Sequence, residues 1–158
     1  MIREIEEKEY KEAVDVIKNS FLTVANEFGF TVENAPGFVA FSTNEDKILS
    51  WKNEQRPMLG FFKDDKMVGF YNLCINGNEC ELGSLSVLPE YRHDKIGQQL
   101  LEDACNRAKS LGCNVLNLSI VEENKVLRAW YEDHGFIHEY TKKFDFFPFT
   151  CGYMKKKL

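Results

Sequence analysis

The sequence has no long apolar run, no internal repeat and no low-complexity segment or linker. A membrane-spanning helix needs about 20 mostly apolar residues in a row, so we expect no contact with a membrane. The amino terminus, MIREIEEKEYKEAV, is too highly charged for a secretory signal peptide. We therefore predict one domain over residues 1–158, located in the cytoplasm.

The sequence also lacks a CxxC pair, and its five cysteines are an odd number. These features predict reduced thiols rather than a disulfide framework. His134 and His138 have a spacing that suits metal ligands, but Gly135 interrupts the helix between them. Because catalytic zinc takes three protein ligands and no third ligand is nearby, we predict no metal site.

An excess of basic residues is absent too, since 20 Lys and Arg against 25 Asp and Glu give a net charge of −5. This balance disfavours a nucleic acid partner, which requires a basic face. It is compatible with a cationic amine substrate, although net charge more often serves solubility.

What is present is an ordered series of elements. We predict strands over 2–5, 58–62, 67–75, 80–88, 114–121, 136–144 and 150–156, helices over 10–28, 44–52, 92–110 and 124–134, and an irregular segment over 31–41. Asn76-Gly77 is a strong hairpin signal, so the second to fourth strands form an antiparallel meander. The apolar run over 114–121 is typical of a buried parallel strand, which makes the sheet mixed.

The chain is organised around Leu85 to Leu101, LSVLPEYRHDKIGQQLL. Pro89 ends an apolar strand because proline lacks the N–H that the ladder needs. A polar loop follows, and a helix begins among Arg92 to Gly97. The first turn of a helix offers free N–H groups and a partial positive charge, so this segment predicts an anion site.

Arg92-His93-Asp94-Lys95-Ile96-Gly97 resembles the signature of the GNAT superfamily of N-acetyltransferases, Arg/Gln-x-x-Gly-x-Gly/Ala. Arg92 and Gly97 match, while Lys95 stands where the first glycine is usual. We expect Lys95 to lie in a helical turn, which tolerates lysine.

A second stretch resembles the same family's Asn-x-x-Ala-x-x-hydrophobic-Tyr-x-x-x-Gly-Phe. Asn124, Tyr131, Gly135 and Phe136 match, and Leu127 replaces the small residue. The resemblance implies a single-domain GNAT-like α/β (mixed α+β) fold, with a mixed sheet of about seven strands flanked by about four helices. It also implies that the fourth and fifth strands diverge into a V-shaped cleft for acetyl-CoA, and it leaves a homodimer open.

The resemblance further implies which groups bind the cofactor. Backbone groups of Leu85 and Val87 pair with the pantetheine arm, and the Val87 N–H is the expected oxyanion donor. Asn124 holds the pantetheine amide, caps its helix, or does both. The loop that surrounds the pyrophosphate consists of Arg92, His93, Asp94, Lys95, Ile96, Gly97 and Gln98.

Two side chains are candidates for catalysis. By resemblance, Tyr131 is the acid that protonates the leaving thiolate, the alternative being that it only packs and orients the sulfur. Glu81 lies on the same face as Leu85 and Val87 by two-residue alternation. It is a candidate base, or a group that attracts the substrate ammonium, or a solvated edge carboxylate.

Two aromatic features lie outside the motifs. We expect Trp51 to cover the core rather than line a pocket. The bend over 144–149 carries three phenylalanines next to Pro148, and we expect it to form a wall of the acceptor site.

Our main hypothesis is a cytoplasmic N-acetyltransferase that moves an acetyl group from acetyl-CoA to a primary amine by direct attack. One alternative is an acyl-CoA-sensing module that has the cleft without the reaction. A second is a mononucleotide-binding α/β protein, which the meander disfavours because doubly wound folds alternate strand and helix. The amine is undetermined: a polyamine or aminoglycoside, an amino acid and a protein N-terminus all fit.

Overall fold

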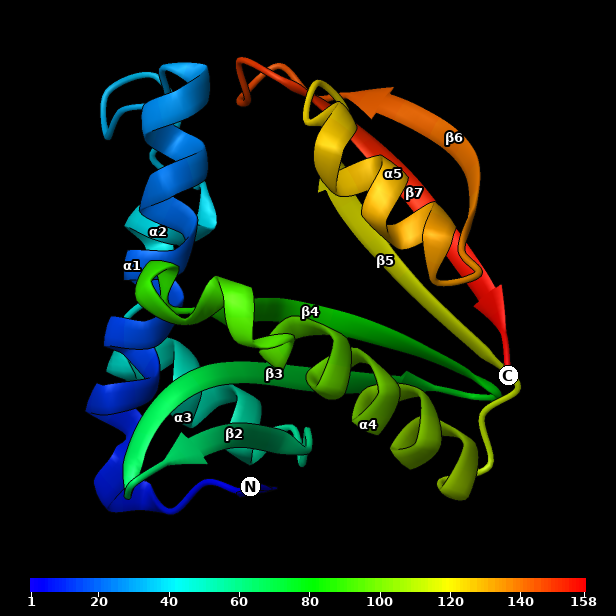
Figure 1. The fold of residues 1–158 in the computed structure, drawn as a ribbon. Coiled ribbons are helices and arrows are strands. Elements are labelled where there is room, and N and C mark those ends of the chain that lie inside the picture. Colours follow the sequence, from blue (N-terminus) through cyan, green and yellow to red (C-terminus); the bar gives the residue numbers. More distant parts are fainter.

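A computed structural model describes all residues, 1–158. Its seven strands form one sheet in the order β1-β2-β3-β4-β5-β7-β6 (Figure 1). The strands are β1 (Ile2–Glu4), β2 (Met58–Lys63), β3 (Lys66–Asn76), β4 (Glu79–Val87), β5 (Val115–Val121), β6 (Ile137–Lys143) and β7 (Thr150–Lys157). The predicted meander of β2, β3 and β4 is confirmed, and β5 runs parallel to β4.

Five α-helices and two short 3-10 helices complete the fold. They are η1 (Glu7–Glu9), α1 (Tyr10–Phe28), α2 (Val39–Ser42), α3 (Glu45–Asn53), η2 (Pro89–Asp94), α4 (Ile96–Ser110) and α5 (Lys125–Asp133). The four predicted helices are present. The prediction that 31–41 is irregular was wrong at its end, where α2 forms a single turn. The predicted start of the central helix, among Arg92 to Gly97, is confirmed at Ile96, while Arg92 itself belongs to η2.

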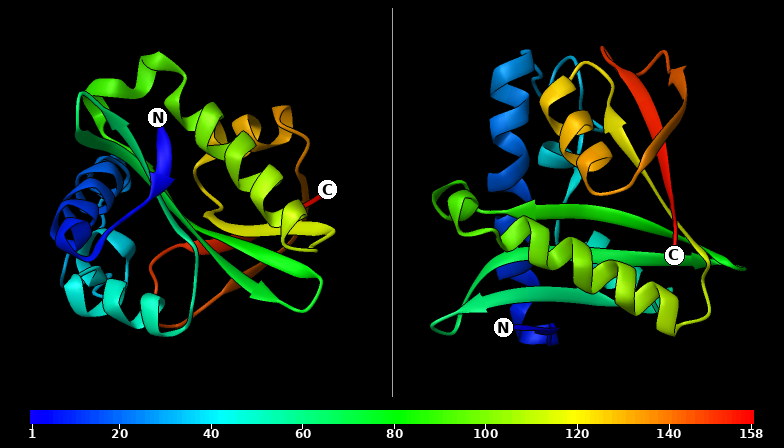
Figure 2. Two further views of the ribbon diagram at one scale, coloured as in Figure 1. Left: turned by 90° about the horizontal axis from the view of Figure 1, so that it is seen from below. Right: turned by 45° about the vertical axis from the view of Figure 1, so that its right-hand side comes forward.

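The sheet is covered by helices on both faces. Figure 1 and Figure 2 show α4 and α5 on one face and α1 and α3 on the other. The α4 helix approaches closely at Gly69, where an added Cβ would lie 2.7 Å from Leu100. On the opposite face, Trp51 of α3 stacks on Phe70 of β3 with ring centroids 6.2 Å apart. Trp51 is 7% exposed, so the prediction that it belongs to the core is confirmed.

The β4 and β5 strands pair over only three residues each. Glu79 to Glu81 face Val115 to Asn117, and beyond them the two strands diverge (Figure 1). The remaining length of β4 therefore has no strand partner on its β5 side. This arrangement confirms the expected V shape and leaves backbone groups of β4 open to a ligand.

A β-bulge interrupts β4 between Gly83 and Ser86. Gly83 pairs with Asn72 and Ser86 pairs with Phe70, so Ser84 and Leu85 together face a single β3 residue. Ser84 has a φ of 51°, a left-handed conformation that accommodates the extra residue. Because side chains alternate along a strand, the extra residue moves each later side chain to the opposite face.

A cluster of aromatic side chains connects the region of α1 and α2 to the bend that precedes β7. Phe149 is 6% exposed, and its ring centroid lies 4.8 Å from that of Phe30. Phe147 stacks on Phe149 at 4.6 Å, whereas Phe146 is 64% exposed. The bend over 144–149 thus packs mainly against the segment after α1. Its role as an acceptor-site wall stays a prediction.

Candidate active site

The amino terminus of α4 has free N–H groups. No side chain caps α4 at Lys95. The first N–H group of α4 that has an acceptor is that of Gln99, which donates to the Lys95 carbonyl oxygen at 3.2 Å. The N–H groups of Ile96, Gly97 and Gln98 donate to no acceptor in the chain. Unpaired N–H groups at a helix start attract anions, so the geometry suits a pyrophosphate.

Lys95 adopts a left-handed conformation with a φ of 57°. The expectation that Lys95 lies in a helical turn was therefore wrong, because the residue is the junction between η2 and α4. Left-handed backbone costs a residue with a Cβ about 1–2 kcal/mol, and glycine avoids that cost. This conformation gives a physical reason for the glycine that is usual at the position.

The Arg92 side chain points to α1 rather than into the loop. Its Nη2 donates to the carbonyl oxygen of Ser20 at 2.8 Å and to the Ser20 Oγ at 3.2 Å. Its Nη1 donates to the Thr23 Oγ1 at 2.9 Å. The guanidinium therefore fixes η2 to α1, and only the Arg92 backbone is left to contact a cofactor.

Ser20 also contacts Val87, the predicted oxyanion donor. The Val87 N–H donates to the Ser20 Oγ at 3.3 Å. Leu88 donates its N–H to the Val68 carbonyl of β3, so by antiparallel alternation the Val87 N–H points away from β3. Val87 thus directs its N–H toward the open side of β4, where Ser20 accepts the hydrogen bond, and its role as oxyanion donor stays a prediction.

The other loop residues differ in exposure. His93 is exposed, and Asp94 forms an ion pair with Lys63 at 3.0 Å. The Ile96 side chain is 1% exposed in the core, so only its backbone can contact a ligand. Gln98 is exposed and donates to Glu102 at 3.3 Å.

Gly97, in the first turn of α4, lies close to both α5 and β4. An added Cβ at Gly97 would lie 3.7 Å from Trp130 of α5 and 3.8 Å from Val87 of β4. These are ordinary contact distances, so a larger side chain there would fill space between α4 and α5. Contact of a ligand with the Gly97 backbone stays a prediction.

Asn124 caps α5. Its Oδ1 accepts a hydrogen bond from the Leu127 N–H at 3.2 Å, so the capping alternative is confirmed. Asn124 is half-buried. Leu127, at a position that is usually small, packs against the main core. A role of Asn124 toward pantetheine stays a prediction.

Tyr131 is buried on the inner face of α5. It is 6% exposed, and its ring contacts Trp130 and Phe136 with centroids 5.0 and 5.4 Å apart. Burial raises the pKa of the Tyr131 hydroxyl above its usual value, and no hydrogen bond or charged neighbour contributes to the shift. The phenol therefore stays protonated at neutral pH, as a proton donor must.

Glu81 does not share a face with Val87, contrary to the prediction from alternation. Glu81 pairs with Cys74, and Val87, beyond the bulge, pairs with Gly69. Cys74 lies on the α3 side of β3, because it alternates in step with Phe70, whereas Gly69 contacts α4. The bulge at Ser84 is the physical reason for the error. Glu81 is exposed and lies on the α1 and α3 face of the sheet.

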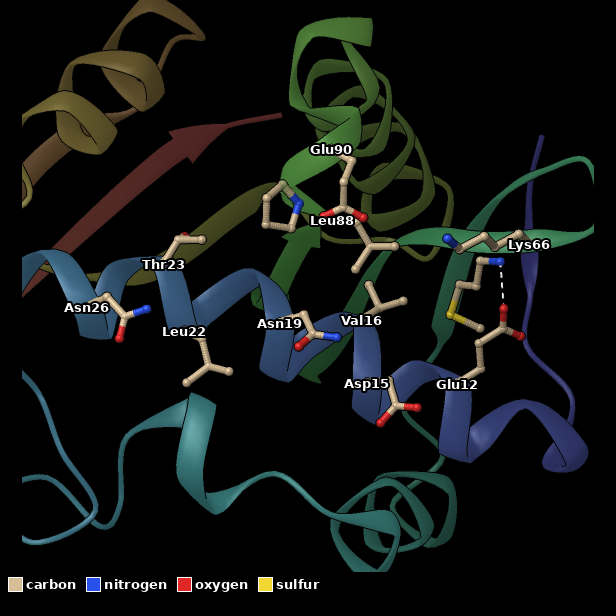
Figure 3. A pocket seen from close by; sticks show the side chains of 12 residues that line it. Glu12, Asp15, Val16, Asn19, Leu22, Thr23, Asn26, Lys66, Leu88 and Glu90 are labelled. Atoms are coloured by element: carbon tan, nitrogen blue, oxygen red, sulfur yellow. Dashed lines mark hydrogen bonds between the residues drawn. The ribbon is translucent and has the colours of Figure 1, made fainter.

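A groove of about 490 Å³ runs along α1, beside the start of β3 and the start of η2 (Figure 3). The carboxylates of Glu12, Asp15 and Glu90 line it together with Lys66. Glu12 accepts the Met67 N–H at 2.8 Å, so part of this charge already has a partner in the fold. None of the residues predicted for the cofactor or for catalysis lines this groove. We therefore place the candidate site at the diverging strands.

Sequence reasoning missed three residues of this region. Ser20 joins Val87 to Arg92, Trp130 lies across from Gly97, and Asn72 is buried beside Gly83. A serine in the apolar stripe of α1 was a usable signal for Ser20. The long-range contacts of Trp130 and Asn72 left no signal in the local pattern.

The two histidines with metal-like spacing contact other groups. His134 Nδ1 lies 2.7 Å from the Trp130 carbonyl oxygen. His138 Nε2 lies 2.7 Å from a carboxylate oxygen of Glu122. No cluster of three residues that could hold a metal ion is found. None of the helices is both long and apolar enough to cross a membrane.

The curated proteins to which the chain is similar in sequence are named as N-acetyltransferases. The chain is 36% identical over 99 residues to spermidine N(1)-acetyltransferase of Thermoplasma acidophilum, a match that spans 63% of this chain and 62% of that protein. It is 27% identical over 113 residues to the ribosomal protein bS18-alanine N-acetyltransferase of Escherichia coli K12, with 72% and 76% covered.

A solved structure extends the similarity to the full length of the chain. PaiA N-acetyltransferase from Thermoplasma acidophilum, in complex with coenzyme A, superposes with a TM-score of 0.84 at 25% identity. The superposition covers 100% of this chain and 98% of that one. The model of the acetyltransferase (GNAT) family matches residues 25–136, which is more than half of the sequence. The chain therefore belongs to the acetyltransferase (GNAT) family.

Proposed function

We propose that the protein transfers an acetyl group from acetyl-CoA to a primary amine. The observation that carries this proposal is the open edge of β4 beside the uncapped start of α4. An extended amide-containing arm would pair with β4 as a strand does. A pyrophosphate would then meet the N–H groups of Ile96, Gly97 and Gln98.

All but one of the remaining predicted contacts are assigned to the backbone. Leu85 and Val87 would bind the arm, and residues 92–98 would surround the phosphates. Asn124 would add its amide N–H groups, because its Oδ1 is already engaged in the cap. For Val87 to bind a carbonyl oxygen, the Ser20 Oγ must release the Val87 N–H.

The residues on the two faces of the sheet suit different steps. Acetyl-CoA supplies a thioester whose carbonyl carbon the amine nitrogen attacks, after which the carbon–sulfur bond breaks. Backbone N–H groups of β4 would stabilise the charge on the carbonyl oxygen. Tyr131, on the α5 side, would protonate the departing sulfur. Glu81, on the α1 and α3 side, would attract the ammonium and accept its proton directly or through water.

The opposite placement of these groups supports direct transfer in a ternary complex. Cofactor and amine would approach from different faces through the gap between β4 and β5. The acceptor would be a small-molecule or peptide amine. The Thermoplasma relative is named for spermidine and the Escherichia coli relative for a ribosomal protein alanine, so both classes are reasonable probes.

We also propose that residues 1–158 act as one acetyltransferase domain in the cytoplasm. One continuous sheet includes strands from both ends of the chain, from β1 to β7. All five cysteines are free thiols, as a reducing compartment would keep them.

The test is release of CoA thiol from acetyl-CoA with spermidine, with a tripeptide that begins with alanine, and with no amine. We expect release above the amine-free rate for at least one of them. If the protein binds acetyl-CoA but no amine of a broad panel increases the release of CoA thiol, the acyl-CoA-sensing module is favoured instead.

A further inference from the structure

Asn72, on the central strand β3, has the one buried side-chain atom that lacks a hydrogen bond. The residue is 1% exposed, and its Oδ1 has no partner. Three other polar residues are buried, but Ser20, Thr43 and Ser86 all have hydrogen-bond partners. A buried amide oxygen left unpaired costs about 1–3 kcal/mol of stability, so its presence calls for an explanation.

Gly83 makes room for the Asn72 side chain. The two residues are paired across β3 and β4. A Cβ added at Gly83 would lie 2.9 Å from the Asn72 Nδ2 and 3.0 Å from Oδ1. The amide thus occupies the space above β4 that a side chain at position 83 would otherwise fill. Gly83 itself is half-buried, so part of the β4 backbone is exposed at this point.

The position of this amide matches the acceptor side of the candidate site. Asn72 shares the α1 and α3 face with Glu81, because the pairs Asn72–Gly83 and Cys74–Glu81 alternate in step. The bulge at Ser84 follows directly, at the point where β4 has already separated from β5. The unpaired Oδ1 and the exposed Glu81 carboxylate therefore lie on the same stretch of sheet, next to the gap.

We propose that the Asn72 amide turns toward the gap when the amine binds, so that its Oδ1, which is closed to solvent in the structure, accepts an N–H from the acceptor ammonium and orients the amine, while Glu81 supplies the opposing charge. The inference rests on the proposed function and assigns a specificity-determining residue to its acceptor side. An amide oxygen accepts from N–H donors and leaves an apolar group without a partner, and the Glu81 carboxylate favours a cation, so together they favour an ammonium group. The binding of the amine also satisfies the oxygen that the fold leaves unpaired.

The first test is steady-state kinetics of Asn72→Leu with the better of spermidine and the alanine tripeptide. Leucine has a similar size and no polar atom. We expect the KM for the amine to rise about tenfold or more, as for loss of a hydrogen bond to a charged group, with the KM for acetyl-CoA unchanged. The midpoint of unfolding should be unchanged or higher, because the unpaired oxygen is removed.

Two further variants separate this role from a structural one. Gly83→Ala, which would push the amide away, should raise the amine KM as Asn72→Leu does, and the double variant should be no worse than either. Thr43→Val is the matched control, since Thr43 is also 1% exposed but donates to the Val39 carbonyl at 2.6 Å. It should lower stability and leave the amine KM unchanged.

An unchanged amine KM in Asn72→Leu, with active wild type, would overturn the proposal and leave a buried water as the partner of Oδ1. If the wild type releases no thiol with any amine, the proposed function fails, and NMR decides the inference separately. The Asn72 side-chain amide signal, assigned by its loss in Asn72→Leu, should shift when spermidine or the tripeptide is added with CoA. N-acetylated forms should not shift it, and no shift with either free amine would overturn the proposal.

Discussion

Lys95 combines a strained backbone with a position beside the predicted phosphate site. Its φ of 57° is left-handed, and no side chain caps the helix that follows. We predict that Lys95→Gly raises the free energy of unfolding by up to about 1 kcal/mol, because glycine adopts this conformation without a steric penalty. Urea denaturation measures the change. Lys95→Ala is the control and should gain little, since alanine retains the Cβ, and a loss of stability in Lys95→Gly would contradict this reading.

Tyr131 is the residue whose substitution tests the chemistry most specifically. We predict that Tyr131→Phe lowers kcat by about 10²–10⁴-fold, the usual contribution of a positioned acid, and leaves the Kd for acetyl-CoA unchanged. The phenylalanine keeps the ring contacts with Trp130 and Phe136. Tyr140→Phe, on the edge strand β6, should have no effect on kcat. Equal turnover in Tyr131→Phe would remove Tyr131 from the mechanism.

The dependence of kcat on pH also tests the role of Tyr131. Burial raises the pKa of Tyr131, and a phenol is a proton donor only below its pKa. The donor form therefore persists past the usual tyrosine pKa of about 10. We predict that kcat shows no alkaline decrease attributable to Tyr131 below that pH. A decrease at lower pH that disappears in Tyr131→Phe would contradict this prediction.

At the scale of the elements, the Arg92 side chain connects η2 to α1 through three hydrogen bonds. We predict that Arg92→Lys raises the KM for acetyl-CoA about tenfold, because lysine keeps the charge and loses the fork that holds the loop. Arg107→Lys is the matched control, since Arg107 of α4 contacts Asp103 at 3.5 Å, and it should leave this KM unchanged. An unaffected KM in Arg92→Lys would show that the loop keeps its position without the contact to α1.

The order and type of the elements could be predicted because each depends on local signals. Helical periodicity predicted α1 over 10–28, and Asn76-Gly77 predicted the β3–β4 turn. The face of Glu81 could not be predicted in this way. The bulge at Ser84 depends on how β4 packs beside β3, and one extra residue reverses every later side chain.

The position of the helix start in the candidate site could be predicted from the local sequence motif. The side-chain contacts that depend on tertiary packing could not. The segment from Arg92 to Gln98 contains an uncapped helix start, and its contact with a pyrophosphate stays a prediction. The left-handed Lys95 and the contact of Arg92 with Ser20 arise only when η2 meets α1, which local sequence does not encode. The buried amide of Asn72 likewise depends on Gly83 across the strand pair.

Across the fold, several ionisable tyrosine and cysteine side chains are buried in the core. Burial raises the pKa of Tyr71 and of Tyr131, and it raises the pKa of Cys80 to about 12. A raised pKa in the folded state gives stability that is fully present below the unfolded pKa and lost as pH rises. Unfolded values are about 8.5 for cysteine and about 10 for tyrosine.

We therefore predict that the free energy of unfolding decreases steadily above about pH 8.5 and steeply above about pH 10. Urea denaturation over this range measures it. Tyr71→Phe, which cannot ionise at that position, should show a smaller decrease above pH 10 than the wild type. Constant stability up to pH 11 in the wild type would contradict the burial of these groups.

The thermal stability of the protein with acetyl-CoA, compared with CoA, ATP and NAD, shows whether the diverging strands bind the cofactor. The diverging β4 and β5 strands beside the start of α4 predict stabilisation by the two CoA species alone. At about a hundred times the Kd the gain should be roughly 2.7 kcal/mol, which is a measurable shift in Tm. No shift with acetyl-CoA in a folded sample would mean that the opening between the strands does not bind the cofactor, and it would contradict the proposed acetyl transfer.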